Sequence, residues 1–359
     1  MATALSSSNW TERGGRTIVG STPDGSVVDL FVLEHEGIDA AIMTYGGRLT
    51  SLRTPDRYGK MEDVILNYAV LDSYLADRSC YLGAIVGRYA NRIASGRISV
   101  GDRTYQAVTN DHGNALHGGN VGFDQQLWSA RPLCSGVELT LTSPDGDQGF
   151  PGNLTVRVRY TISANALRID YFCSTDQTTV VNLTNQTYFN LSGRSDTTIL
   201  DDELTISADR FTPVNSALIP TGILSPVEGT PFDFRSKAVI GERIGDRHEQ
   251  LKIADGYDHN FVLNGAAGEL RTVARLHSPV SGRTLRVSTT EPGMQFYAGH
   301  FLDNHQYGKA LEGHGRYAGL CLETQHFPDS PNHPSFPSTE LRPGHVGRST
   351  TIFEFSVDE

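Results

Sequence analysis

Apolar and polar residues alternate in three neighbouring segments of the chain: Val137-Glu138-Leu139-Thr140-Leu141, Leu154-Thr155-Val156-Arg157-Val158-Arg159-Tyr160 and Leu167-Arg168-Ile169-Asp170-Tyr171. A period of two indicates β-strands with one face against a core and the other face toward polar surroundings. Residues typical of turns separate these segments, as in Ser143-Pro144-Asp145-Gly146-Asp147 and Ser163-Ala164-Asn165. The three segments therefore predict strands of an antiparallel sheet.

The rest of the chain extends this prediction. Its 37 glycines and 16 prolines are spread along the sequence, which indicates many tight turns. Helical periodicity is nearly absent, and Leu71 to Asp77 is the best candidate for a short helix. Neither a repeat nor a shift in composition marks a boundary. We therefore expect one all-β domain over residues 1–359, a large antiparallel β-sandwich, with the polar residues 1–16 as a flexible or peripheral segment.

Composition and charge restrict the class of protein. Hydrophobic residues make up 38% of the chain, enough to fill a core, and 30 basic against 41 acidic residues give a net charge of −11. An acidic protein repels phosphates, so we expect neither nucleic acid nor a membrane surface as a partner. The sequence contains no 18-residue apolar run and no visible signal peptide. We therefore expect a cytoplasmic protein whose four cysteines are reduced thiols: Cys80, Cys134, Cys173 and Cys321.

The histidines do not form a metal-binding pattern. Nine of the twelve lie from His248 onward, but spacings such as those between His300 and His305 match no usual ligand set. The chain also contains no phosphate-binding loop, dinucleotide-binding glycine fingerprint or HExxH motif. We therefore expect no metal site and no organic cofactor.

Six segments combine amides, charged groups, aromatic rings and glycines: 87–93, 114–124, 182–191, 256–261, 291–297 and 322–329. Each of them alone fits a surface loop, a turn or an exposed strand face. Six such segments in one β-rich chain are unusual, however. Amides and carboxylates bind hydroxyl groups, and aromatic rings pack against C–H faces, so together the segments indicate a neutral polyhydroxylated ligand.

The order and spacing of several motifs resemble those of the aldose 1-epimerase family, the galactose mutarotases. The motifs are Gly87-Arg88-Tyr89-Ala90-Asn91-Arg92-Ile93, Leu116-His117-Gly118-Gly119, Thr212-Pro213-Val214-Asn215 through Pro231-Phe232-Asp233-Phe234, Tyr257-Asp258-His259-Asn260 and Leu322-Glu323-Thr324-Gln325-His326-Phe327-Pro328-Asp329. The resemblance implies a galactose mutarotase-like supersandwich with a sugar site in an open cleft. It implies a small sugar or sugar-like cyclic substrate, no cofactor, and a monomer or homodimer.

The resemblance also implies roles for individual residues. Glu323 would be the general base that acts on the anomeric hydroxyl. The family places its general acid, a histidine, in a Thr-Asn-His-x-Tyr segment, but this chain reads Thr184-Asn185-Gln186-Thr187-Tyr188, so Gln186 stands at the position of the acid. The residues expected to contact the sugar are Asn91, Arg92, His117, Tyr188, Asp258 and Gln295.

Gln186 changes the expected chemistry, because an amide donates a hydrogen bond but cannot donate a proton. Loss of a general acid typically costs about 10²–10⁴-fold in rate. Three hypotheses follow. His117 serves as a substitute acid in a mutarotase, or the fold carries another reaction on a hemiacetal, lactone or related cyclic compound, or the protein binds carbohydrate without turnover. The presence of both Glu323 and His117 argues against the last hypothesis.

Overall fold

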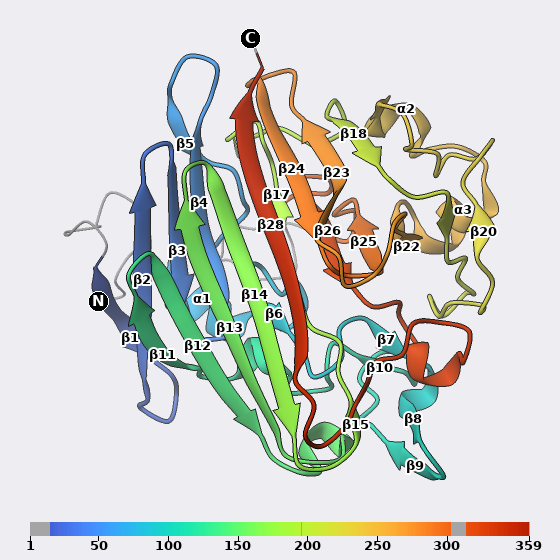
Figure 1. Ribbon diagram of the computed structural model, residues 1–359. Coiled ribbons are helices and arrows are strands. Elements are labelled where there is room, and N and C mark those ends of the chain that lie inside the picture. Colours follow the sequence, from blue (N-terminus) through green and yellow to red (C-terminus); the bar gives the residue numbers. More distant parts are fainter. Residues whose placement is uncertain (1–14, 195, 303–313, 359) are drawn as a thin grey trace.

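A computed structural model describes residues 15–194, 196–302 and 314–358 (Figure 1). Its named strands pair antiparallel. The five-stranded sheet follows the chain order: β1 (Arg16–Ser21), β2 (Val27–His35), β3 (Ile38–Met43), β4 (Arg48–Pro55) and β5 (Met61–Asp63). The order of the nine-stranded sheet is β11 (Ser129–Leu133), β12 (Gly136–Ser143), β13 (Leu154–Ser163), β14 (Ala166–Thr175), β28 (Gly347–Val357), β24 (Arg283–Thr289), β23 (Arg271–His277), β18 (Glu203–Ile206) and β21 (Ala238–Val239).

A six-stranded sheet carries most of the candidate site. Its order is β17 (Tyr188–Phe189), β26 (Leu320–Gln325), β25 (Gly293–Tyr297), β22 (Asp258–Val262), β19 (Arg210–Phe211) and β20 (Ser225–Pro226). Four two-strand ribbons complete the β-structure: β6 (Ile85–Val86) with β16 (Thr184–Asn185), β7 (Arg92–Ile93) with β10 (Ala115–Leu116), β8 (Arg97–Val100) with β9 (Arg103–Gln106), and β15 (Thr179–Val180) with β27 (Glu340–Leu341).

Helices are few and short in the described ranges: α1 (Leu71–Ala76), α2 (Ile240–Arg243) and α3 (Glu249–Ala254), with 3₁₀ turns at Ala94–Gly96, Phe123–Gln125, Asp147–Gly149 and Ser330–Asn332. The helix predicted from Leu71 is therefore confirmed to within one residue. The three predicted strands are also confirmed, as β12, β13 and β14. Among the described helices, none has the length and apolar character needed to cross a membrane.

The core lies between the sheets. One continuous cluster of buried side chains takes Val158 and Ile169 from the nine-stranded sheet, Ile42 from the five-stranded sheet, and Phe296 and Leu322 from the six-stranded sheet. The all-β sandwich is therefore confirmed. In Figure 1 the strands β12 to β14 and β28 run across the front of the molecule. Because inward residues alternate with outward ones, the strand with the clearest period, β13, buries every second side chain.

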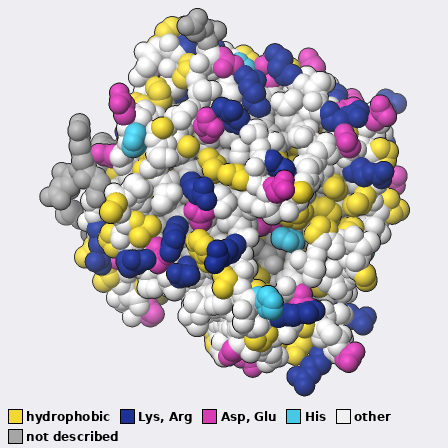
Figure 2. All heavy atoms as spheres, in the orientation of Figure 1, with side chains coloured by type: hydrophobic (Ala, Val, Ile, Leu, Met, Phe, Trp, Pro, Cys, Tyr) yellow, Lys and Arg dark blue, Asp and Glu magenta, His cyan; other side chains and the backbone are white. Residues whose placement is uncertain are grey.

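The outer face of the nine-stranded sheet is polar. Figure 2 shows basic side chains gathered over this face. On this face, Arg157, Arg159 and Arg348 place their guanidinium carbons 5.5, 5.0 and 5.9 Å from the ring centre of Phe172. Glu138 lies beside Arg159 and forms an ion pair with it at 2.5 Å. This face is the solvent side that the alternating sequence predicted.

The expected single domain over residues 1–359 stays a prediction. Of its expected peripheral segment 1–16, residues 1–14 lie outside the described residues, and Arg16 is the first residue of β1. None of the four cysteines lies in a disulfide among the described residues, and three of them are buried while Cys134 is exposed.

Candidate active site

Three adjacent strands of the six-stranded sheet place a row of polar side chains on one face. Gln295 on β25 lies directly opposite Glu323 on β26 and, on its other side, opposite Asn260 on β22. Directly opposed residues share a face, and the next residues, such as Phe296 and Leu322, point into the hydrophobic core. The polar row therefore lies on the side of the sheet that faces away from that core.

Glu323 is buried without a compensating partner. Its exposed fraction is 3%, and its Oε2 has no hydrogen-bond partner among the described residues. Gln295 donates from Nε2 to Oδ1 of Asp258 over 2.6 Å rather than to Glu323. Burial raises the pKa of Glu323 well above its usual value, and the negative charge of Asp258 raises it further. The carboxyl group therefore keeps its proton at a pH where an exposed glutamate is ionised.

Gln186 and Tyr188 lie at the edge of this row. β17 pairs with β26 so that Tyr188 is opposite Cys321, two residues from Glu323. Gln186 donates from Nε2 to the hydroxyl oxygen of Tyr188 over 3.2 Å, while its Oε1 has no partner among the described residues. Burial is the main reason that the pKa of Tyr188 is raised well above its usual value. Neither side chain is a ready proton donor near neutral pH.

A second group of predicted residues lies on loops around β7 and β10. The main-chain N–H of Asn91 donates to Nδ1 of His117 over 3.2 Å, which places the proton of the neutral ring on Nε2. Both residues have positive φ angles, 63° and 51°, in the left-handed region that few side chains adopt. Burial, assisted by the charge of Arg92, lowers the pKa of His117 to about 3. The imidazole is therefore neutral near pH 7.

Arg92 connects this group to the acidic side chains around it. Its Nε donates to Oδ2 of Asp111 over 2.7 Å, and no described residue accepts a hydrogen bond from its terminal amino groups. The charges of Arg92, Asp258 and Asp111 all act on His117. The loop residues and the sheet residues therefore lie within electrostatic range of one another. The structure thus brings together the three sets Glu323–Gln295–Asp258, Gln186–Tyr188 and Asn91–Arg92–His117.

Sequence reasoning missed four neighbours of these residues. Asn260 and Gln325 are almost fully buried. In each of them, neither the oxygen nor the nitrogen of the side-chain amide has a hydrogen-bond partner among the described residues. The period of two could have identified them, since each lies two residues from a predicted site residue on the same strand. Asp111 and Tyr81 carried no such signal, although the ring of Tyr81 lies 4.7 Å from that of His117, centre to centre.

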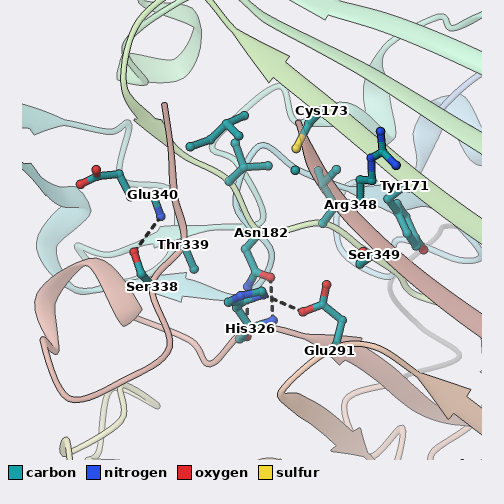
Figure 3. A pocket seen from close by; sticks show the side chains of 14 residues that line it. Tyr171, Cys173, Asn182, Glu291, His326, Ser338, Thr339, Glu340, Arg348 and Ser349 are labelled. Carbon is teal, nitrogen blue, oxygen red and sulfur yellow. Dashed lines mark hydrogen bonds and ion pairs between the residues drawn. The ribbon is translucent and has the colours of Figure 1, made fainter. Parts of the chain in front are cut away.

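A different polar group lies directly after β26, around His326 (Figure 3). The side chain of Asn182 donates from Nδ2 to the carbonyl oxygens of Ala90 (3.2 Å) and His326 (3.1 Å), and its Oδ1 accepts from the N–H of His326 (2.9 Å). Nδ1 of His326 also forms an ion pair with Glu291 at 2.6 Å. Asn182, Glu291 and His326 line a cavity of about 210 Å³ together with residues of β14, β27 and β28. The side-chain hydrogen bonds of Asn182 therefore connect the end of the strand that carries Glu323 to the segment that precedes Asn91 and Arg92.

Comparison with known proteins assigns the family. A sequence model described as aldose 1-epimerase matches residues 29–354. The mouse galactose mutarotase is 46% identical over 343 residues, which cover 95% of this chain and 98% of the mouse protein.

The chain belongs to the aldose 1-epimerase family.

More distant members agree with this assignment. The Escherichia coli aldose 1-epimerase is 37% identical over 341 residues, or 94% of this chain and 97% of that protein. The crystal structure of a galactose 1-epimerase from Lactobacillus acidophilus superimposes with a TM-score of 0.85 at 31% identity, covering 96% of this chain and 99% of that chain. The family match includes all eight sequence-predicted site residues, since each lies between residues 29 and 354.

Proposed function

We propose that this member of the family is an isomerase that interconverts the α and β anomers of a free aldose, with a small sugar as its substrate. The observation that carries the proposal is the position of Glu323, a buried carboxyl group in a row of hydrogen-bonding side chains, opposite Gln295 and close to Asp258. A carboxyl group with a raised pKa can exchange protons near neutral pH, as the reaction requires. The names of the relatives support the same activity.

The reaction opens and recloses a hemiacetal ring. An oxygen of Glu323 accepts the proton of the anomeric hydroxyl, the bond between C1 and the ring oxygen breaks as the ring oxygen takes up a proton, and a carbonyl forms at C1. Rotation about the C1–C2 bond then presents the other carbonyl face for closure. Arg92, Asn91, Asp258 and Gln295 bind the sugar hydroxyls, and hydrogen bonds to charged groups are worth about 1.5–3 kcal/mol each.

His117 has a binding role in this proposal. Its Nδ1 accepts the N–H of Asn91, so its Nε2–H is the group available to a sugar oxygen. Because its pKa is about 3, only a small fraction of the ring carries a second proton at pH 7. We therefore assign His117 as a hydrogen-bond donor to the ring oxygen, where it stabilises developing negative charge.

Polarimetry on freshly dissolved α-glucose and α-galactose tests the proposed function. The protein should speed the approach to anomeric equilibrium above the buffer rate, and Glu323→Gln should remove more than about nine-tenths of the increase. Asp202→Asn is the matched control, because Asp202 is also a buried carboxyl group, with a pKa raised by burial to about 7, and lies outside the site. A wild-type rate equal to buffer across several aldoses would contradict the proposal.

A further inference from the structure

Gln186, His117 and Tyr188 offer no group that could protonate the ring oxygen near neutral pH. Gln186 carries an amide, which has no acidic proton to give, and donates from Nε2 to the hydroxyl oxygen of Tyr188. The buried His117 accepts a hydrogen bond at Nδ1, as a neutral ring does. Tyr188 is buried among Tyr297 and Cys321, which do not favour its ionised form. The proton that the ring oxygen must receive therefore has no source among these three residues.

The surroundings of Glu323 favour its protonated form. The titratable groups that act on it or lie beside it are Asp258 on β22, Cys321 on its own strand and Tyr188 on β17. None of these is a cation, and no described lysine or arginine forms an ion pair with Glu323. Across the site, Arg92 is paired with Asp111. A buried carboxyl group near a second carboxyl group, without a cation, is stable as the neutral acid.

We propose that Glu323 is both the acid and the base of the reaction, acting through the two oxygens of one protonated carboxyl group. The inference rests on the proposed function. The carboxyl O–H gives its proton to the ring oxygen as the bond between C1 and that oxygen breaks. At the same time the carbonyl oxygen of Glu323 accepts the proton of the C1 hydroxyl, and C1 becomes a carbonyl carbon. Glu323 ends the step as a neutral acid with its two oxygens exchanged, so no charge, electron or further reactant is needed.

Geometry suits such an exchange. The two oxygens of a carboxyl group are bonded to one carbon, and so are the ring oxygen and the hydroxyl oxygen of C1, so the two pairs have similar spacings. One planar carboxyl group can therefore span both sugar oxygens. The side chain also has an oxygen available for this contact, because Oε2 of Glu323 is unpartnered while Gln295 is turned toward Asp258. Ring closure on the other face of C1 is the same exchange in reverse.

The direction of the pH dependence separates this mechanism from catalysis by the ionised form. If the neutral acid is the active form, kcat/KM of the wild-type protein falls about tenfold per pH unit above the pKa of Glu323. If the ionised form acts as a base alone, kcat/KM rises with pH through the same range and the inference is wrong. Polarimetry from about pH 5 to pH 9, with the buffer rate subtracted at each pH and folding checked by circular dichroism, measures this slope.

A matched variant completes the test. Gln186→His supplies a separate acid, so its profile should gain a rising limb at low pH that the wild-type profile lacks. If the wild-type protein did not exceed the buffer rate at any pH, the proposed function itself would be contradicted. A wild-type profile that rises with pH would overturn the inference and leave the proposed function in place.

Discussion

Gln295 lies directly opposite Glu323 on the neighbouring strand, yet its amide donates to Asp258 over 2.6 Å and leaves Oε2 of Glu323 without a partner. An amide that bonded to Glu323 would stabilise the carboxylate and lower the pKa of this residue. Because Gln295 is turned away, burial and the charge of Asp258 act on Glu323 unopposed. The protonation state of Glu323 therefore depends on a neighbouring side chain that forms no hydrogen bond with it.

Gln186→His should increase mutarotation. A histidine at this position can give a proton to the ring oxygen, and its positive form lowers the pKa of the nearby Glu323. We expect a gain in kcat of about tenfold or more, with a bell-shaped profile in which Glu323 sets the acidic limb and the new histidine sets the basic limb. Failure to gain activity would mean that the site does not hold an aldose with its ring oxygen near residue 186.

Asp258→Asn should shift the pH profile to lower pH. Removing the negative charge beside Glu323 makes its ionised form less costly, so the pKa of Glu323 falls toward its usual value. The decline of kcat/KM with rising pH should therefore begin at a lower pH, and KM should rise because a sugar contact is lost. Asp255→Asn is the control, since it removes the same charge from an exposed ion pair with Arg316. Equal shifts in both variants would argue against a local effect.

Glu323→Gln should stabilise the folded protein while it removes activity. The pKa of Glu323 is raised in the folded state, so the folded state binds more protons and stability falls as pH rises above the unfolded pKa. The neutral amide lacks this penalty, which is worth about 1.4 kcal/mol for each unit of difference between the two pKa values. Urea unfolding measures the free energy of unfolding of both proteins. The excess of the variant over the wild type should grow from about pH 4 to about pH 8. A constant difference across this range would show that Glu323 has an ordinary pKa.

Asn182→Asp should raise KM without a matching loss of folding. The substitution removes both hydrogen bonds that the amide donates, to the carbonyls of Ala90 and His326. These bonds connect the segment before Arg92 to the strand of Glu323, so we expect misalignment of the two sides of the site and a rise in KM of about five- to tenfold.

Asn190→Asp provides the control for this prediction. Asn190 is also buried, and its amide donates to main-chain carbonyls, including that of Ala318 over 2.8 Å, but it does not bridge the two sides of the site. KM does not depend on the fraction of folded protein, so a purely structural effect would lower the rate equally in both variants and leave KM unchanged. An unchanged KM in Asn182→Asp would contradict the bridging role.

The alternation of apolar and polar residues predicted much of the fold, because it is strong wherever a strand has one buried face. β12, β13 and β14 are long, alternate clearly and were identified directly. β17 and β19 have two residues each, too few to show a period, and they form only because neighbouring strands pair with them. The position of the six-stranded sheet could therefore not be predicted from its own segments.

The same limit applies to the candidate site. Its residue types were visible in short motifs, but the direction of the Gln295 amide depends on Asp258, a residue 37 positions away. Asn182 lies in the polar segment 182–191, yet its role depends on Ala90 and His326, which lie 92 and 144 residues away in the chain. Only the folded structure brings these partners together.

Anomer exchange at equilibrium tests the central claim most directly. Proton NMR saturation transfer between the two anomeric signals of equilibrated galactose measures interconversion without a product assay and without the initial mixing period of polarimetry. We predict transfer that grows in proportion to the concentration of wild-type protein and is absent with Glu323→Gln. Transfer no greater than in buffer, or equal transfer with the variant, would contradict an anomer-interconverting role for Glu323.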